Sequence, residues 1–463
     1  MRRDALVRRL RYASSRHPLL RQFREWARDA DATILLVGGA VRDAALGRSW
    51  KDIDLTVASG RDRLLRAIEA RYSTTGFRFR KRGVTTWRVR LDGQDIDLVD
   101  ATSRGVDADL KRRDLTINAI GYDLVRQQLI DPTGGLRDLR AKRLRAPSPR
   151  AFAEDPLRAL RLARFSAALP DFKAQREAVS AAIEVAPKLR RVSVERVRDE
   201  LDKMLRTPAP ATGLARLRSW GQLQPLLPEL EPLTGCAAGQ DRPDVWEHTL
   251  LTIEASAARP RLPSHRAVRE RGELATLRWA LLLHDISKPE TFELRSDGRP
   301  TFHNHENLGA KRADALLQRL RAPNSMRLRV KQLIRLHLRP GHLADSGPSA
   351  RGLRRLAREA GDDLDLLCLH AACDAYGSGG PGDRPRWRRL GKVLRELPRV
   401  AARLAKIPGE PLLTGSEVMR YGKIPAGPRV GDWMRQLATL RDDGEITTRR
   451  QAVEWLRQAS SDL

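Results

Sequence analysis

Two aspartates separated by one apolar residue, Asp52 and Asp54, stand in the segment ILLVGGAVRDAALGRSWKDIDLTVA. Because the side chains of a β-strand alternate between its two faces, we expect both carboxylates on one face and Ile53 in the core. Two neighbouring negative charges of this kind favour a cation. Mg²⁺ held by one or two carboxylates and by substrate phosphates is the usual arrangement for phosphoryl and nucleotidyl transfer. The spacing therefore predicts a magnesium site at Asp52 and Asp54.

A glycine pair, Gly38 and Gly39, precedes these aspartates at a predicted turn from strand to helix. Backbone N–H groups at such a turn are not covered by side chains, and Arg42 follows on the next helical turn, so a triphosphate can be cradled there. A second DID motif offers Asp97 as a third catalytic carboxylate on a neighbouring strand. The alternative is that Asp95 and Asp97 merely lie on a solvated strand face. The same alternative holds for the glycine pair or for the first DID motif when either is taken alone.

Asp155 and Arg158 lie three residues apart in FAEDPLRALRLARF, at the start of a predicted helix, and therefore project from the same side. Cytosine and adenine present an amino donor beside a ring-nitrogen acceptor, whereas uracil and guanine present a carbonyl beside a ring N–H. A carboxylate next to a guanidinium complements the first pattern and opposes the second. The pair can select C and A without a nucleic-acid template. The alternative is a helix-capping aspartate beside a surface arginine.

The motifs GGAVRD, DID, RRDLTINA and EDPLRALR, in this order and spacing, resemble those of class II tRNA nucleotidyltransferases and the related bacterial poly(A) polymerases of the polymerase-β-like superfamily. The resemblance covers at least residues 31–205. It implies that Asp52 and Asp54 bind two metal ions that activate the primer 3′-hydroxyl and neutralise the departing pyrophosphate, and that Asp155 and Arg158 read the base. The residues that it implies for the triphosphate, the ribose and the ordering of their loops are Gly38, Gly39, Arg42, Asp43, Arg113, Asp114 and Asn118.

The implied activity is addition of C and/or A nucleotides from CTP and ATP to the 3′ end of tRNA. Family members that build the whole CCA end usually carry a longer segment before the RRD motif, whereas DIDLVDATSRGVDADLKRRD contains almost no insertion. A CC-only enzyme, an A-only enzyme and a poly(A) polymerase therefore stay open. In the following helical segment, Glu195 and Arg196 are expected to support the structure rather than to contact substrate.

A second set of residues, His248, His284 with Asp285, and Asp374, lies in VWEHT, ALLLHDISKPET and HAACDAYG. This succession resembles the HD phosphohydrolase superfamily. It implies a divalent transition-metal site that hydrolyses a phosphomonoester or a 2′,3′-cyclic phosphate, with a degenerate structural remnant as the alternative.

Four further histidines surround this set. His305 and His337 match places where such domains carry additional histidines, whereas His303 and His342 have no assigned position. A hypothesis of another class follows, in which phosphoester hydrolysis on RNA ends or nucleotides is the principal activity and the N-terminal part tethers RNA.

Lysine and arginine number 87 against 58 aspartates and glutamates, a formal net charge of +29 that is spread along the chain. This excess indicates a polyanionic partner, although a compositional bias towards arginine would also raise the charge. The resemblance implies that this partner is the tRNA acceptor arm. The 3 cysteines are too few and too irregularly spaced for a disulfide framework, which indicates a reducing compartment. No apolar run is long enough for a membrane helix, and we expect a cytoplasmic protein.

The elements that must position these residues are of two kinds. Strand-like runs (ILLVGGAV, DIDLTVA, TTWRVRL, QDIDLVDA and TINAIGYDL) mix with helical stretches such as RDRLLRAIEARY over residues 31–131, and strand signals stop near residue 146. We therefore predict an α+β fold in which a mixed-sheet head is followed by helices alone. The expected domains are a catalytic head (1–145), a base-selecting and RNA-binding neck (146–238), an HD-type domain (239–385) and a helical tail that contacts tRNA (386–463).

Overall fold

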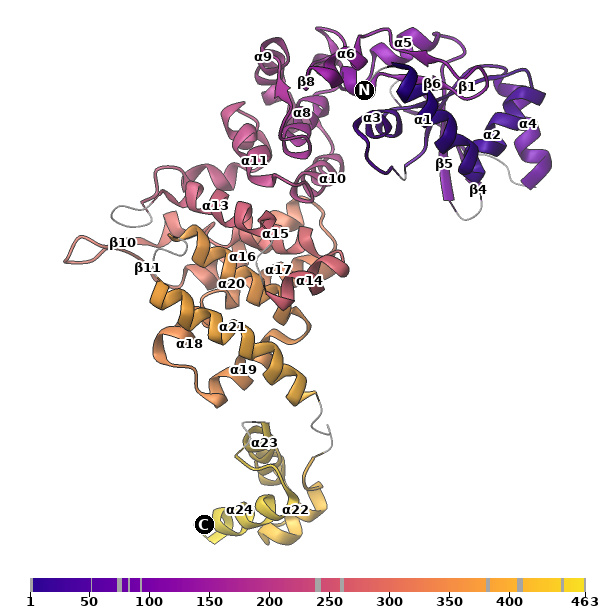
Figure 1. Cartoon of the computed structure of the whole chain (residues 1–463). Helices are drawn as coiled ribbons and strands as arrows, with labels where there is room; N and C mark the ends of the chain where they lie inside the picture. Colours follow the sequence, from indigo (N-terminus) through magenta and orange to yellow (C-terminus); the bar gives the residue numbers. More distant parts are fainter. Residues whose placement is uncertain are drawn as a thin grey trace. The chain divides into compact units, whose positions relative to one another are not determined.

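A computed structural model of the chain describes residues 3–50, 52–72, 77–81, 84–91, 94–237, 243–258, 262–379, 384–405, 411–442 and 445–461. It divides into two compact units, Met1–Pro228 and Glu229–Leu463 (Figure 1). The first unit contains a sheet and the second is almost entirely helical, so the predicted α+β fold class is confirmed.

The sheet of the first unit has seven strands in the order β3-β4-β5-β2-β1-β6-β7. Only β2 and β5 run parallel; the remaining neighbours are antiparallel, which makes the sheet mixed. The strands are β1 (Thr33–Val37), β2 (Asp54–Ser59), β3 (Phe77–Lys81), β4 (Val84–Leu91), β5 (Gln94–Asp100), β6 (Gly121–Asp123) and β7 (Leu129–Ile130). β1 lies inside the sheet, and its residues Ile34 to Val37 are fully buried on both faces.

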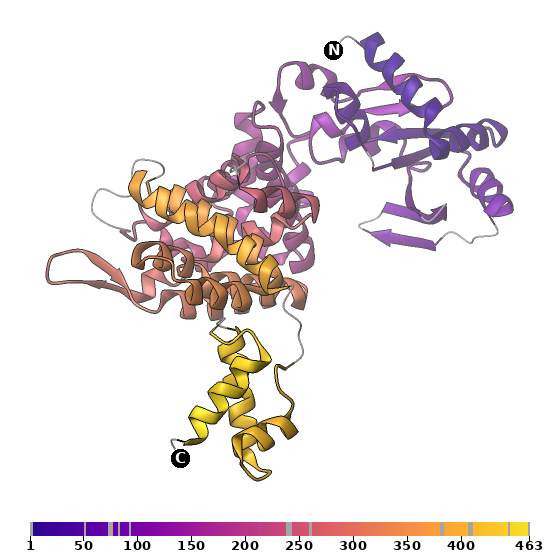
Figure 2. The same cartoon turned by 60° about the horizontal axis from the view of Figure 1, so that its bottom comes forward.

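Helices flank this sheet and continue into the rest of the first unit (Figure 2). Those of the head are α1 (Arg3–Arg16), α2 (Pro18–Asp29), α3 (Gly39–Leu46), α4 (Arg61–Tyr72), α5 (Val106–Lys111), the 3₁₀ turn η1 (Thr116–Asn118) and α6 (Gly135–Arg140). They are followed by α7 (Ala151–Glu154), α8 (Leu157–Ala168), α9 (Arg176–Val185), η2 (Ala186–Arg191), α10 (Val194–Leu205), α11 (Pro210–Ser219) and α12 (Leu223–Leu226). Eight of the 12 residues of α8 are buried, so α8 is the central helix of this group.

The second unit begins with η3 (Pro228–Leu233) and continues with α13 (Val245–Ala257), α14 (Pro263–Glu270), α15 (Leu274–Leu283), α16 (His305–Arg319), α17 (Asn324–Leu336), α18 (Arg339–Ser346), α19 (Ala350–Ala360), α20 (Leu364–Gly377) and α21 (Arg384–Leu404). Its last helices, drawn in yellow in Figures 1 and 2, are α22 (Gly415–Gly422), α23 (Pro428–Asp442) and α24 (Arg449–Ser461). These three have an apolar cluster of their own, which includes Val418, Trp433 and Leu456.

Three predictions about elements were wrong. Strands do not stop near residue 146, because short pairs β8 (Arg143–Leu144) with β9 (Lys173–Ala174) and β10 (Phe292–Leu294) with β11 (Pro300–Phe302) follow. The run TINAIGYDL is a strand only from Gly121, since its first residues form η1. Asp52 precedes the second strand, which begins at Asp54.

No helix in the described ranges combines the length and the apolar character that spanning a membrane requires.

Candidate active sites

The first candidate site lies where β1 turns into α3. Gly38 caps α3 with a φ of +72°. A Cβ added there would lie 3.1 Å from Asp54 Oδ2 and 3.2 Å from Arg113 Nη1, so the carboxylate and the guanidinium both lie against this glycine. A helix N-terminus, a carboxylate and a cationic side chain thus meet at one point, an arrangement that suits a phosphate and its metal ion.

The three predicted carboxylates of the head lie close together, but they are not equivalent. Asp52 and Asp54 are exposed on either side of the buried Ile53, although Asp52 lies before the strand. Asp97 is the register partner of Asp54 on the parallel strand β5. However, Arg88 of β4 forms a bidentate ion pair with Asp97, at 2.8 and 2.9 Å. Asp97 is therefore already paired with a cation in this arrangement, whereas Asp54 and Arg113 each lie beside Gly38.

Buried residues hold the guanidinium of Arg113 in place. Its Nη2 lies 3.4 Å from Thr56 Oγ1 of β2 and 3.6 Å from the carboxylate of Asp109, which is fully buried. Arg112 Nε also donates to Asp109, at 2.7 Å. Because Asp109 is held by two arginines, the Nη1 side of Arg113 stays directed to Gly38 and Asp54.

A chain of hydrogen bonds connects α3 with the RRD segment. Arg42 donates twice to Asp43, at 2.9 and 2.8 Å, and once to Asn118 Oδ1, at 2.8 Å. Asn118 Nδ2 donates in turn to Asp114, at 2.9 Å. Arg161 of α8 lies 3.4 Å from the other oxygen of Asp114. The sequence motifs GGAVRD, RRDLTINA and EDPLRALR therefore come together around one network.

Local charge perturbs two of these carboxyl groups in opposite directions. Burial raises the pKa of Asp54, Arg113 opposes this, and the negative charges of Asp52 and Asp97 raise it further. Burial alone would raise the pKa of Asp114, but Arg161 and the Asn118 hydrogen bond bring it below its ordinary value. The positive charge near Asp54 is thus too small to offset burial and the neighbouring carboxylates, and a divalent cation would supply more.

Asp155 and Arg158 lie at the junction of α7 and α8. Asp155 is buried and accepts from Arg196 Nη2 of α10 at 2.8 Å, while Arg158 Nη1 donates to the carbonyl of Ala151 at 2.8 Å. Arg158 also lies 3.5 Å from Glu154. Arg196, which the sequence suggested only as a structural support, therefore contacts the candidate base-reading carboxylate directly.

The second candidate site gathers all six predicted metal-binding residues of unit 2. His248 Nε2 lies 3.2 Å from His284 Nε2 and 3.1 Å from Asp374 Oδ1. Two overlapping groups, in each of which the ligand atoms lie within 4.8 Å of one another, share Asp285: His248 with His284, and His305 with His337. Within the described ranges the head aspartates form no group of this kind. His284 and Asp285 follow α15 instead of lying on it.

The donor set fits a metal ion. The Nδ1 atoms of His284, His305 and His337 lie 2.8, 2.7 and 2.6 Å from backbone carbonyls, which fixes them as donors and leaves each Nε2 as a ligand atom. Asp285 Oδ1 and His305 Nε2 have no hydrogen-bond partner although both atoms are buried, whereas Asp285 Oδ2 lies 2.7 Å from Lys288 Nζ. Unpartnered buried polar atoms that converge in this way are what a coordinating site requires.

The charges within this cluster are strongly coupled. Burial alone would lower the pKa of His284, but Asp285 and Asp374 raise it to about 10. Burial lowers the pKa of His337 to about 4.

Sequence reasoning missed two residues of this cluster. Lys288 Nζ lies 2.7 Å from Asp285 Oδ2, and its position three residues after Asp285 was the available signal. His370 is fully buried one helical turn before Asp374, with ring centroids 5.4 Å from His284 and 5.7 Å from His337. The two unassigned histidines, His303 and His342, are exposed.

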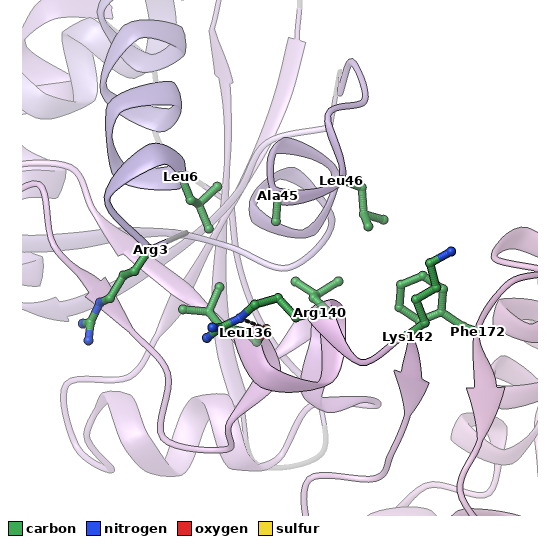
Figure 3. Close-up of a pocket in the computed structure, with 9 residues that line it drawn as sticks. Arg3, Leu6, Ala45, Leu46, Leu136, Arg140, Lys142 and Phe172 are labelled. Atoms are coloured by element: carbon green, nitrogen blue, oxygen red, sulfur yellow. Dashed lines mark hydrogen bonds between the residues drawn. The ribbon is translucent and has the colours of Figure 1, made fainter. Parts of the chain in front are cut away.

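A separate hollow of about 210 Å³ in the first unit does not belong to either site (Figure 3). Its floor is apolar, with Leu6 of α1, Leu46 of α3 and Leu136 of α6. It lies at the C-terminal end of α3, opposite Gly39. Two cations at its edge have partners outside it, since Arg3 donates to the Leu129 carbonyl and Lys142 to Asp171.

Comparison with known proteins finds matches over the segments that contain both candidate sites. Residues 34–145 match the family model of the Poly A polymerase head domain, residues 171–234 match the model described as "Probable RNA and SrmB- binding site of polymerase A", and residues 245–375 match the HD domain. An A-adding tRNA nucleotidyltransferase of Deinococcus radiodurans is 36% identical over 437 residues, 91% of this chain and 94% of the relative. A multifunctional CCA protein of Alkalilimnicola ehrlichii is 34% identical over 400 residues, 81% and 91% of the two chains.

The fold is likewise similar to that of a solved structure, a CCA-adding enzyme of Thermotoga maritima complexed with tRNA. The TM-score is 0.63 over 98% of both chains, at 20% sequence identity.

Proposed function

The chain belongs to the family of tRNA nucleotidyltransferases that includes A-adding and multifunctional CCA enzymes, and from this premise we propose that its first unit adds C and/or A nucleotides from CTP and ATP to the 3′ end of tRNA. The observation that carries the proposal is the meeting of Asp54, Arg113 and the N-terminus of α3 at Gly38. Asp52 and Asp54 would hold Mg²⁺, with Asp97 as a more distant third carboxylate. Mg²⁺ bound there supplies activation of the primer hydroxyl and neutralisation of the leaving pyrophosphate.

The remaining head residues bind and orient the nucleotide. The exposed N–H groups at Gly38 and Gly39 and the guanidinium of Arg113 are suited to the triphosphate. The carboxylate of Asp114 stays charged because its pKa is held low. It can therefore accept a hydrogen bond from a ribose hydroxyl. Asn118 keeps its amide turned to Asp114 because Arg42, itself paired with Asp43, occupies its oxygen.

Base choice is assigned to Asp155 and Arg158. The carboxylate accepts from the amino group of cytosine or adenine, and the guanidinium donates to the adjacent ring nitrogen. Arg196 donates to Asp155 from α10 and so orients it. We also retain the four-part division at residues 145, 238 and 385, with tRNA contacts in the neck and tail.

The terminal A is the product that the relatives favour, since the A-adding enzyme matches over a larger share of the chain than the multifunctional protein does. The short path from β5 to Arg113, which contains only α5, agrees with a partial enzyme.

The free cysteines Cys236, Cys368 and Cys373 support a reducing location, which we take to be the cytoplasm.

Extension of tRNA transcripts that end at the discriminator base, at C and at CC, with each labelled nucleoside triphosphate and Mg²⁺, tests this proposal. Addition of A to the CC end alone identifies an A-adding enzyme, and stepwise addition identifies a CCA-adding enzyme. Untemplated runs of A on any RNA would identify a poly(A) polymerase. Failure of a folded protein to extend any of the three transcripts would contradict tRNA nucleotidyl transfer.

A second function, phosphoester hydrolysis at the HD site, is favoured by the unpartnered Asp285 Oδ1 and by the buried histidine Nε2 atoms that converge on this carboxylate. His248, His284, Asp285 and Asp374 would hold a divalent transition metal, with His305 and His337 as additional ligands. A metal ion bound there supplies an activated water and charge neutralisation at the phosphate. Lys288 lies beside Asp285 and adds a positive charge for the phosphate.

Metal analysis tests this arrangement without any activity assay. Asp285 belongs to both groups, so Asp285→Asn should remove nearly all bound metal, whereas His305→Ala should affect one group only. His303→Ala is the matched control, because His303 is exposed and outside both groups. Equal metal content in Asp285→Asn and the wild type would contradict the site.

A further inference from the structure

The loop that joins α3 to β2 carries an aromatic residue, Trp50, with no role so far. The loop begins at Gly47, which ends α3 with a φ of +78°. Residues 47–49 are exposed, and Trp50 is half-buried. Trp50 stands two residues before Asp52, so their Cα atoms are at most about 7 Å apart. An aromatic side chain is therefore placed next to the candidate Mg²⁺ site.

His17, the residue that follows α1, supports Trp50 from one side. The two ring centroids lie 6.1 Å apart and the ring planes are inclined by 13°, so the rings are stacked. Burial lowers the pKa of His17, and its ring is therefore uncharged at neutral pH. Because Trp50 is only half-buried, part of the indole stays accessible to a ligand.

Arginines lie beside the same loop. A Cβ added on Gly47 would lie 3.3 Å from Nη1 of Arg9, so the guanidinium of this α1 residue lies against the loop. Arg9 and the loop residue Arg48 are both exposed, which leaves their charges accessible to a phosphate. A positively charged surface next to an aromatic ring is the combination by which many proteins bind single-stranded nucleic acid.

We propose that Trp50 binds the last base of the RNA primer and that Arg9 binds a phosphate that precedes this base. The primer 3′-hydroxyl must reach the metal ion at Asp52, and the terminal base is only one ribose away from that hydroxyl. Stacking on an aromatic ring tolerates any base, so the primer end is held without being read. The incoming base is assigned to Asp155 and Arg158. The inference rests on the proposed nucleotidyl transfer and adds the binding site for the end of its RNA substrate.

The test uses the full-length protein with Mg²⁺ and two RNAs, a tRNA transcript that ends in CC and the same transcript without the base of its last nucleotide. Binding is measured by fluorescence anisotropy with 3′-deoxy forms of both RNAs and without nucleoside triphosphate. Extension of the unmodified transcript gives separate KM values for the RNA and for ATP. Trp50→Leu removes the ring and Trp50→Phe retains one. Trp26→Leu is the matched control, since Trp26 is half-buried in α2 of the same unit and packs edge-on against Phe23.

Trp50→Leu should weaken binding of the intact RNA about tenfold, within the range of one stacked base, and leave the affinity for the abasic RNA unchanged. In extension, the loss should appear in the KM for the RNA, with the KM for ATP unchanged. Trp50→Phe should restore most of the affinity, and Trp26→Leu should bind both RNAs like the wild type. Arg9→Ala should weaken binding of both RNAs by the same factor, because both retain the phosphate.

Unchanged affinity for the intact RNA in Trp50→Leu would overturn the proposal. An equal loss for both RNAs would overturn it too, since the ring would then not contact the terminal base. A rise in the KM for ATP alone would assign Trp50 to the incoming nucleotide and contradict the primer site. Trp50-dependent binding of an RNA that the wild type does not extend would contradict the transferase function and support the primer site.

Discussion

At the scale of single residues, Gly38 determines whether the head carboxylate and Arg113 can approach α3. Its φ of +72° disfavours a side chain, and a Cβ at 3.1 and 3.2 Å from two side-chain atoms would force them to shift by a few tenths of an ångström. Gly221 offers a comparison, because it has a φ of +65° but no atom within 4 Å of an added Cβ. A side chain would strain the backbone at both positions. Only at Gly38 would it also collide with residues of the site.

We expect Gly38→Ala to lower the free energy of unfolding by about 1–2 kcal/mol and nucleotidyl transfer by roughly 100-fold, because the new methyl group displaces Asp54 or Arg113. Gly221→Ala should lose similar stability and keep full activity. Thermal unfolding and single-turnover tRNA extension of both variants provide the measurement. Equal activity in the two variants would show that the approach at Gly38 is unimportant for the reaction.

Arg196 should act as a positioning residue for base choice, because its hydrogen bond to Asp155 is short and both side chains are largely shielded from solvent. Arg196→Ala should reduce discrimination of ATP and CTP against GTP and UTP by about tenfold, and Asp155→Ala should abolish it. The control is Arg198→Ala, on the same helix but paired with the exposed Asp199. The readout is the ratio of kcat/KM values, which a general loss of stability leaves constant. Unchanged ratios in Asp155→Ala would contradict the protein template.

At the scale of elements, an ion-pair network ties the start of α15 to α17 and α20. Glu273 accepts from Arg271 and Arg329 at 2.6 Å each, and Arg329 also donates to Asp363 at 2.6 Å. Burial alone would raise the pKa of Glu273, but the hydrogen bonds from both arginines lower it. Because the folded value lies below the unfolded value, the stabilisation is present above the unfolded pKa and is lost as the pH falls through the folded pKa.

Glu273→Gln should therefore lower the free energy of unfolding by roughly 1 kcal/mol at pH 7, a modest value because the network is partly solvated. The difference from the wild type should begin to shrink below about pH 4.5, where the unfolded chain takes up the proton first, and should continue to shrink down to the lower folded pKa. Denaturant titrations at pH 7, 5 and 3.5 provide the test, with Glu270→Gln as the control, since Glu270 forms an exposed pair within one helix. A difference that does not change with pH would contradict the ion-pair origin.

Elements with a clear period were predictable from the sequence. RDRLLRAIEARY forms a helix over the predicted residues, and the carboxylates at 52 and 54 flank a buried Ile53. The family and the α+β class inferred from the motifs are confirmed. The roles of the individual site residues stay predictions, since neither the fold nor the relatives test them.

What the sequence could not predict depends on contacts between distant segments. Thr116 begins a 3₁₀ turn instead of a strand because its carbonyl packs against α6, where a Cβ on Gly135 would lie 2.1 Å away. The ion pair of Arg88 with Asp97 depends on strand register. By contrast, the hairpin of β10 and β11 had a visible signal in Asp297-Gly298, which is typical of a tight turn.

At the scale of the whole molecule, the two candidate sites belong to separate compact units of a strongly basic chain. The net charge of +29 favours RNA as the partner of both, because phosphate contacts supply affinity without sequence information. The carboxylates of the head and the histidine cluster share no residue. The two activities should therefore be separable by single substitutions.

Asp54→Asn should abolish extension of tRNA and leave hydrolysis of phosphomonoesters unchanged, because Asp54 lies in the first unit, beside Gly38. Asp285→Asn should do the reverse, since Asp285 is common to both metal-binding groups of the second unit. Both activities are measured on the same preparations, with circular dichroism as the test of folding. Loss of extension in a folded Asp285→Asn protein would mean that the HD cluster contributes to nucleotidyl transfer itself. The two sites would then have to be treated as one coupled system, because a free energy change at one would alter the transition state at the other.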